Sequence, residues 1–195
     1  MRSVQKVTKD SSLSWYEAVL QNPALSTPES SLRLLEVVLA RYWSFDNHMH
    51  EGQIVVRKDV VGDITTAFNA MEREHFPLAS VVPVADPRFH WDDNLSMEAN
   101  NTSAFNYRKV VGDESRMSYH AYGLAIDINP LLNPYHKGDV VLPSGARYDV
   151  AQPGTIAADG FLVALFKKLG WKWGGDFETL KDYQHFEKHG GIDLP

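Results

Sequence analysis

Residues that could carry chemistry gather in the stretch 118–130, where a histidine and an aspartate stand seven residues apart with a glycine between them. In 124–129 apolar residues alternate with small or polar ones, the period of a half-buried strand, so we expect Asp127 on the face opposite the two isoleucines. Gly123 can turn the chain and bring the imidazole of His120 toward that face. A neutral imidazole and a carboxylate aimed at one point are two of the three protein ligands of a catalytic zinc site.

A candidate for the third ligand comes near the end of the chain, where Asp182 precedes His185 by three residues. On a continuous strand these side chains would face opposite ways, whereas a turn or a short helical segment would let them converge. If His185 is the third ligand, Asp182 can sit beside the open fourth position and transfer protons there. His189 has i,i+4 spacing from His185, but Gly190 and Gly191 disfavour a helix, so we favour His185 alone.

Arg108 is a candidate contact for negative charge. The stretch 104–111 alternates as a strand would, and Arg108 shares a face with Asn106 and Val110. A cation is unusual on such a face if the face belongs to the core.

Each candidate also has an ordinary role open to it. Asp127 could accept backbone hydrogen bonds, Asp182 could lie in a surface turn, and Arg108 could pair with any of the 25 acidic residues. A single histidine is more often solvated or hydrogen-bonded than bound to a metal. We keep that interpretation for the remaining histidines: His48, His50, His75, His90, His136 and His189.

The composition is that of one ordinary globular domain of 195 residues, 44% of them hydrophobic. The net charge of −6 gives no support to nucleic-acid binding. No apolar run approaches the ~18 residues of a membrane span, and no signal peptide is visible near the N-terminus. Cysteine is absent, so any metal must be held by His, Asp or Glu.

The elements that would position these residues alternate between helix and strand, which predicts an α+β fold with helices against a sheet. We divide the chain into an N-terminal helical segment, 1–45, and a domain over 46–195. The expected elements are a short helix over 15–20, a helix from Thr27 and Pro28 through Leu39, a strand over 52–58, a helix over 60–71, a strand over 78–84, and a helix from about 158 to 169 that Gly170 ends.

Three segments give the chain a resemblance to a known family. The run from Ser118 to Asp127 meets every fixed position of the S-x-H-x-x-G-x-A-x-D motif of the M15 zinc peptidases, the D-alanyl-D-alanine carboxypeptidase family. The residues 173–176 and 182–186 resemble the family's second block, and 100–108 resembles its arginine-bearing segment. The resemblance covers roughly residues 50–190 and leaves 1–45 outside.

This resemblance implies an antiparallel sheet with helices packed on it, the fold shared with the Hedgehog signalling domain. It implies one zinc ion on His120, Asp127 and His185, with Asp182 as general base. Arg108 would bind the polarised carbonyl or the developing oxyanion, and Ser118 would support the turn or contact substrate.

The implied substrate is the peptide of peptidoglycan, acted on outside the cytoplasm, in the periplasm or cell envelope. We expect a D-alanyl-D-alanine carboxypeptidase. The alternative is an L-alanyl-D-glutamate endopeptidase, because this chain has Asp182 where the carboxypeptidase branch usually has glutamate. A zinc-stabilised binding domain without turnover is a third possibility, although such a domain can lose its base and arginine, and this chain keeps Asp182 and Arg108.

Overall fold

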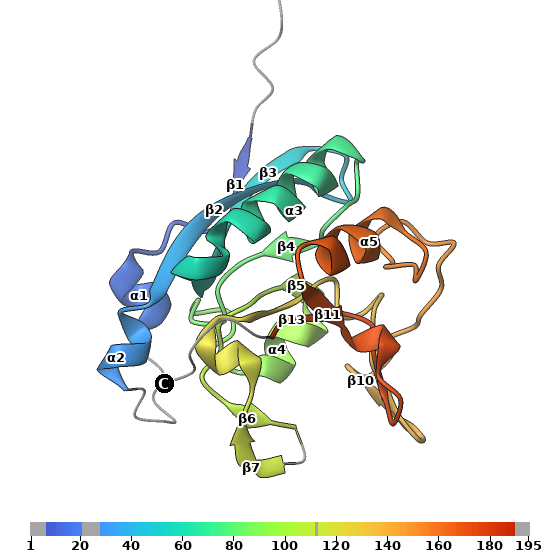
Figure 1. Cartoon of the computed structure of the whole chain (residues 1–195). Helices are drawn as coiled ribbons and strands as arrows, with labels where there is room; N and C mark the ends of the chain where they lie inside the picture. The colour runs from blue at the N-terminus through green and yellow to red at the C-terminus, as the bar shows by residue number, and fades with distance from the viewer. Residues whose placement is uncertain (1–6, 21–27, 112, 190–195) are drawn as a thin grey trace, which may run out of the picture.

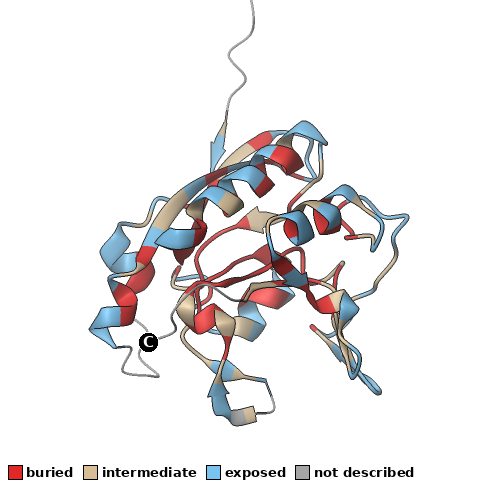
Figure 2. Cartoon of the chain, viewed as in Figure 1, coloured by how far each residue is buried: buried red, intermediate tan, exposed pale blue. Residues whose placement is uncertain are grey.

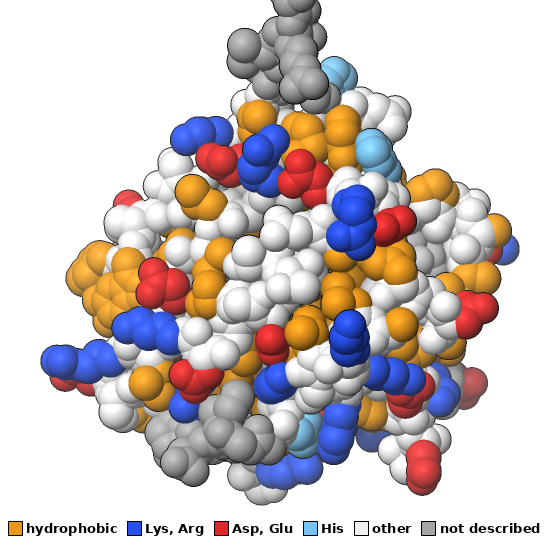
Figure 3. Space-filling model, turned by 45° about the horizontal axis from the view of Figure 1, so that its top comes forward, with side chains coloured by type: hydrophobic (Ala, Val, Ile, Leu, Met, Phe, Trp, Pro, Cys, Tyr) orange, Lys and Arg blue, Asp and Glu red, His pale blue; other side chains and the backbone are white. Residues whose placement is uncertain are grey.

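The computed structural model describes residues 7–20, 28–111 and 113–189, which form a mixed structure of helices and short sheets (Figure 1). Buried residues concentrate in the central strands and on the inward sides of the helices α3 (Val61–Arg73) and α5 (Phe161–Lys168) (Figure 2). One hydrophobic core joins the two main sheets, because Ile54 of the N-terminal sheet and Ile126 of the C-terminal sheet belong to the same buried cluster. Acidic and basic side chains are interspersed on the face seen in Figure 3. Among the described residues, every helix is too short or too polar to cross a membrane.

The N-terminal layer is a three-stranded sheet covered by a long helix. Its strands are β1 (Thr8–Lys9), β2 (Leu35–Trp43) and β3 (Met49–Arg57), in the order β1-β3-β2, and β2 runs antiparallel to β3 along its whole length. After the 3₁₀ helix η1 (Lys58–Val60), α3 (Val61–Arg73) lies across β2. The apolar stripe predicted for this helix is confirmed: Ile64, Ala67, Phe68 and Met71 are buried.

The C-terminal layer is an antiparallel sheet in the order β11 (Trp171–Trp173), β13 (His185–Lys188) and β8 (Ala125–Asp127). Helix α5 (Phe161–Lys168) packs beside β11, and its Phe166 ring stacks on Phe186 with the centroids 4.1 Å apart. The predicted helix end at Gly170 is confirmed, since that glycine has φ +80°.

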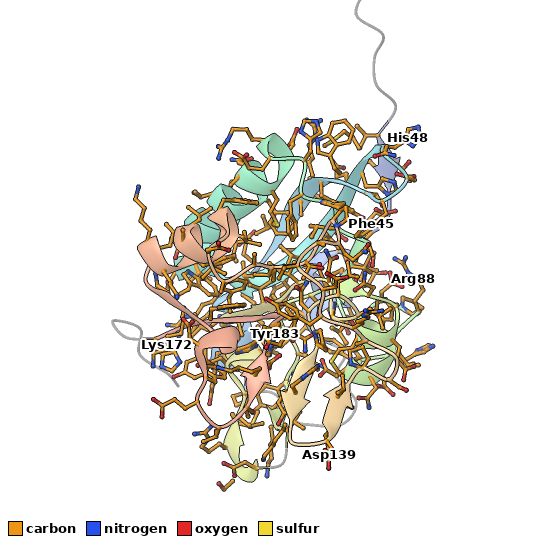
Figure 4. All side chains as sticks on the ribbon, turned by 90° about the vertical axis from the view of Figure 1, so that its right-hand side faces the viewer. Phe45, His48, Arg88, Asp139, Lys172 and Tyr183 are labelled. Atoms are coloured by element: carbon orange, nitrogen blue, oxygen red, sulfur yellow. The ribbon has the colours of Figure 1, made fainter. Side chains whose placement is uncertain are left out.

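Shorter elements surround the C-terminal layer. Strand β4 (Ser80–Val81) pairs with β5 (Asn101–Thr102), β6 (Lys109–Val110) with β7 (Asp113–Met117), and β9 (Tyr135–Lys137) with both β10 (Val140–Leu142) and β12 (Lys181–Asp182). The remaining helices are α1 (Trp15–Val19), α2 (Glu29–Leu32), α4 (Asp93–Glu98), η2 (Tyr119–Tyr122) and η3 (Gly174–Asp176). Figure 4 shows the β9–β10 hairpin projecting from the body with Asp139 at its tip.

The helix expected through Leu39 is wrong. Only Glu29–Leu32 is helical, and the strand β2 begins at Leu35. Apolar spacing over a short run cannot separate helix from strand, and here pairing with β3 decides the outcome. The N-terminal segment 1–45 is therefore not purely helical, and β2 before residue 45 pairs with β3 after it. Thr27, the expected N-cap, lies outside the described residues.

Two expected strands are much shorter than the sequence indicated. Of 78–84 only β4 is a strand, and of 104–111 only β6. The backbone before β6 instead hydrogen-bonds to two different elements, with Phe105 N donating to Val55 O and Asn106 N donating to His120 O. Such scattered partners hold the segment in place without a ladder.

Candidate metal centre and its cavity

Three buried side chains converge at the edge of the C-terminal layer. His120 Nε2 lies 3.1 Å from Asp127 Oδ2, His185 Nδ1 lies 3.0 Å from Asp127 Oδ1, and the two imidazole nitrogens lie 3.2 Å apart. These are the residues that the sequence nominated as metal ligands, and the structure brings all three together. Within the described residues, they form the His/Asp/Glu group that could hold a metal ion.

The local fold explains this convergence. His185 and Asp127 face each other directly across the antiparallel pair β13–β8. His120 reaches them from η2, which Gly123 ends with φ +66°. A Cβ on this glycine would lie 2.7 Å from Arg57 N and from Leu35 Cδ2, so both the dihedral and the close packing require glycine. The predicted turn at Gly123 is confirmed.

The outward nitrogens of both histidines are already occupied. His120 Nδ1 donates to Ala104 O at 2.5 Å, and His185 Nε2 donates to a carboxylate oxygen of Glu187 at 3.2 Å. His120 Nε2 and His185 Nδ1 therefore each keep a lone pair, and these two lone pairs face each other beside Asp127. Two such lone pairs are stable together only with a positive charge between them, so the residues present fit a divalent cation.

The electrostatics of the centre also favour positive charge. Burial alone would lower the pKa of His185, but hydrogen bonds that His185 donates to Asp127 and Glu187 raise the pKa to about 10. Burial would raise the pKa of Asp127, yet His120 and His185 hold that pKa below its usual range. A metal ion would take the place of the proton that these groups otherwise share.

Asp182 lies beside the three candidate ligands with one oxygen unused. Its Oδ1 is buried and has no hydrogen-bond partner among the described residues. Burial, reinforced by the negative charge of Asp127, raises the pKa of Asp182 to about 6 despite the opposing effect of His185. A carboxylate of this pKa is poised to exchange protons near neutral pH.

A turn in the backbone brings Asp182 and His185 together, which is one of the two arrangements that the sequence allowed. Strand β12 ends at Asp182, a two-residue turn follows, and β13 begins at His185. Gly174 makes the approach possible, because a Cβ there would lie 2.8 Å from the Cβ of Asp182. The alternative ligand pair of His185 and His189 is not formed, since His189 Nε2 contacts Glu187.

Arg108 and Ser118 lie at the same cavity as the candidate ligands. The guanidinium of Arg108 forms an ion pair with Asp93 at 3.0 Å, a partner that the sequence analysis missed because it lies fifteen positions away in α4. Ser118 is buried, and its Oγ accepts a hydrogen bond from His120 N at 3.3 Å. Ser118 therefore supports the turn that carries His120, while substrate contact stays a prediction.

The cavity has a volume of about 590 Å³, with the candidate ligands and Asp182 in its lining. Residues of β6, β7 and η2 line it as well, together with Tyr135, Leu142 and the loop over 177–180. A space of this size accepts several residues of an extended peptide. The arrangement can therefore hold a metal ion, a proton acceptor and a cation around one bound chain.

His50 and His75, far from the cavity, have ordinary partners. His50 lies between Asp10 and Asp46, at 2.8 Å and 3.2 Å, and the ring of His75 stacks on Trp43. The functional residue that sequence reasoning missed is Glu187. Its spacing of two from His185 on a strand was the available signal, because i,i+2 residues share a face.

Comparisons with known proteins agree with this geometry. A family model described as D-alanyl-D-alanine carboxypeptidase, of the M15 peptidases, matches residues 112–188. The chain is also 41% identical over 71 residues to the peptidoglycan L-alanyl-D-glutamate endopeptidase CwlK of Bacillus subtilis. That alignment covers 36% of this chain and 38% of the relative, so the chain spans well under half of that enzyme. No solved structure matches the chain. The matched segment, residues 112–188, contains His120, Asp127, Asp182 and His185, so the part of the chain that is similar to the M15 peptidases carries the candidate metal centre.

Proposed function

We propose that this protein is a zinc-dependent peptidase that hydrolyses the L-alanyl-D-glutamate bond in the stem peptide of peptidoglycan. The observation that carries the proposal is the convergence of His120, Asp127 and His185 beside Asp182, whose buried Oδ1 has no partner. A binding domain has no use for a buried carboxylate oxygen without a hydrogen-bond partner, because burying such an atom costs free energy. The hydrolytic role gives it a reason.

His120 Nε2, Asp127 and His185 Nδ1 would hold the zinc ion. When bound by three protein ligands, zinc supplies a Lewis acid that acidifies water and polarises a carbonyl oxygen. Ala104 O and Glu187 keep the two imidazoles in the tautomers that this binding needs.

Asp182 would act as the proton carrier. Its Oδ1, buried and without a hydrogen-bond partner among the described residues, would accept a proton from the attacking water and return it to the leaving amine. Arg108 would face the carbonyl oxygen as negative charge develops there, and Asp93 holds the guanidinium at the cavity. One such donor is worth about 3 kcal/mol in related oxyanion sites.

Two observations bear on which bond is cut. The relative in Bacillus subtilis is named for L-alanyl-D-glutamate cleavage, and aspartate rather than glutamate stands at position 182, as expected for that branch. The family model carries the description D-alanyl-D-alanine carboxypeptidase, which keeps that activity as the second candidate. For either bond, we propose that the protein acts outside the cytoplasm, where the substrate lies. We also propose that it has the fold shared by M15 peptidases and the Hedgehog domain.

The test is digestion of purified peptidoglycan, with mass analysis of the soluble fragments. We expect a new N-terminal D-glutamate, which wild-type protein produces and Asp182→Asn does not. Release of free D-alanine instead would establish the carboxypeptidase. Bound zinc with neither product would favour the binding domain and contradict the proposal.

A further inference from the structure

A chain of hydrogen bonds leads away from the candidate metal centre to side chains that no ligand role uses. Glu187 bridges two histidines, with Oε2 3.2 Å from His185 Nε2 and Oε1 2.6 Å from His189 Nε2. His189 Nδ1 lies 3.1 Å from the hydroxyl of Tyr119, and the two rings stack with their centroids 4.4 Å apart. All three side chains line the cavity.

The donors and acceptors along this chain are consistent in one direction. The Tyr119 hydroxyl donates to His189 Nδ1, His189 Nε2 donates to Glu187, and His185 Nε2 donates to the other oxygen of Glu187. Lys172 Nζ, 3.4 Å from His189 Nδ1, is a second donor to the same nitrogen. Every group therefore has a fixed role, and His185 Nδ1 remains free for a metal.

The chain of contacts also connects the two segments that supply the histidine ligands, η2 and β13. Tyr119 precedes His120 in η2, whereas Glu187 follows His185 in β13 and His189 comes directly after that strand. Glu187 and His185 share a face of that strand because they stand two residues apart. These contacts therefore connect the segment that carries His120 to the segment that carries His185, without the metal.

We propose that Glu187, His189 and Tyr119 are positioning residues that hold the His185 imidazole in its metal-binding orientation. This inference rests on the proposed function, because it assumes a metal at His120, Asp127 and His185. Glu187 contacts the ligand directly, His189 orients Glu187, and Tyr119 orients His189. Their effects on metal affinity must therefore decrease in that order.

The test measures the zinc dissociation constant of the full chain by competition with a chelator. Glu187→Gln removes the carboxylate charge at similar size and weakens zinc binding about 10- to 100-fold. His189→Gln weakens it less, and Tyr119→Phe, which keeps the stacked ring, weakens it least. Tyr122→Phe is the matched control, since Tyr122 lies in the same turn and cavity but outside the chain of contacts, and it leaves the constant unchanged.

Thermal unfolding with and without zinc separates positioning from a merely structural role. A positioning residue reduces the gain in Tm that zinc gives, because that gain reports affinity for the folded state. A structural residue lowers both Tm values equally. If Glu187→Gln fails to fold, His189→Gln and Tyr119→Phe carry the same comparison.

The outcomes distinguish failure of the positioning role from failure of the proposed zinc-dependent function. Wild-type protein that binds no zinc overturns both. Wild-type protein that binds zinc as tightly as all three variants do overturns the positioning role alone. The expected order of affinities, with the zinc-dependent gain in Tm falling in parallel, supports it.

Discussion

Two buried glutamines show how differently the two layers treat polar groups. Gln53, in β3 of the N-terminal layer, uses both ends of its side chain: Oε1 accepts from Ser11 Oγ and Leu13 N, and Nε2 donates to Leu13 O. Gln184, in the turn between β12 and β13, places its Nε2 3.7 Å from the sulfur of Met97 and hydrogen-bonds to Asp182, but its Oε1 has no partner among the described residues. Both residues are buried.

The contrast extends to charged groups at the cavity. Asp182 Oδ1 and Arg108 Nε are likewise buried and without hydrogen-bond partners among the described residues. Unsatisfied buried groups destabilise a protein, so they persist where something else uses them. The buried glutamine of the N-terminal layer is thus fully hydrogen-bonded and stabilises the fold, whereas the cavity of the C-terminal layer has unsatisfied polar groups that a metal and a peptide could use.

The largest effect is expected from removal of a ligand. His120→Ala deletes one of three converging donors, so bound zinc should fall from about one per chain to near zero and activity should vanish. Metal analysis of the purified protein measures this. His75→Ala is the control, because His75 stacks on Trp43 in the N-terminal layer. Full zinc content in His120→Ala would remove the ligand assignment.

Asp182→Asn should separate catalysis from metal binding. The amide cannot accept the proton, so kcat/KM should fall about 10²- to 10⁴-fold while zinc is retained. Thermal stability should not fall, since a neutral group costs less to bury than an unpartnered carboxylate. Unchanged turnover would show that the buried carboxylate is not the base.

Arg108→Ala should lower kcat/KM about 10²-fold or somewhat more with zinc content unaffected, as expected for loss of one oxyanion donor. Arg88→Ala is the matched control, because Arg88 is also held by an aspartate, at 2.8 Å, but contacts the N-terminal strand region through Asp10 O. Equal losses in both variants would show that the effect of Arg108 is structural.

The sequence predicted the chemistry of the centre better than its surroundings. His120 and Asp127 were identifiable as a pair because glycine placement and alternation restrict what the backbone can do locally, and the resemblance to the M15 motifs added His185. Strand β2 was missed because its apolar spacing also fits a helix, and only the pairing with β3, a contact between separate segments, decides between them. Asp93 and His189 were missed as partners for the same reason: their contacts depend on tertiary structure.

The pH dependence of stability should carry the signature of Asp182 in zinc-free protein. Because its folded-state pKa of about 6 lies above the unfolded value of 3.8, the folded state binds the extra proton. Its contribution is therefore fully present below about pH 4 and is lost as the pH rises through 6, by up to about 3 kcal/mol. Urea unfolding of wild type and Asp182→Asn across this range measures the difference. Parallel curves for the two proteins would contradict the raised pKa.

The smallest effect, and the most direct test of the contrast, compares Gln53→Met with Gln184→Met. The first leaves Ser11 Oγ and Leu13 N without their acceptor, so the free energy of unfolding should fall by about 1–3 kcal/mol. The second removes a carboxamide whose Oε1 has no partner and places another thioether beside Met97, so stability should change by less than about 1.5 kcal/mol. Urea unfolding of zinc-free protein measures both. If Gln184→Met lowers the free energy of unfolding as much as Gln53→Met does, Gln184 is a structural residue. Only Asp182 and Arg108 would then remain as unsatisfied polar groups of the cavity.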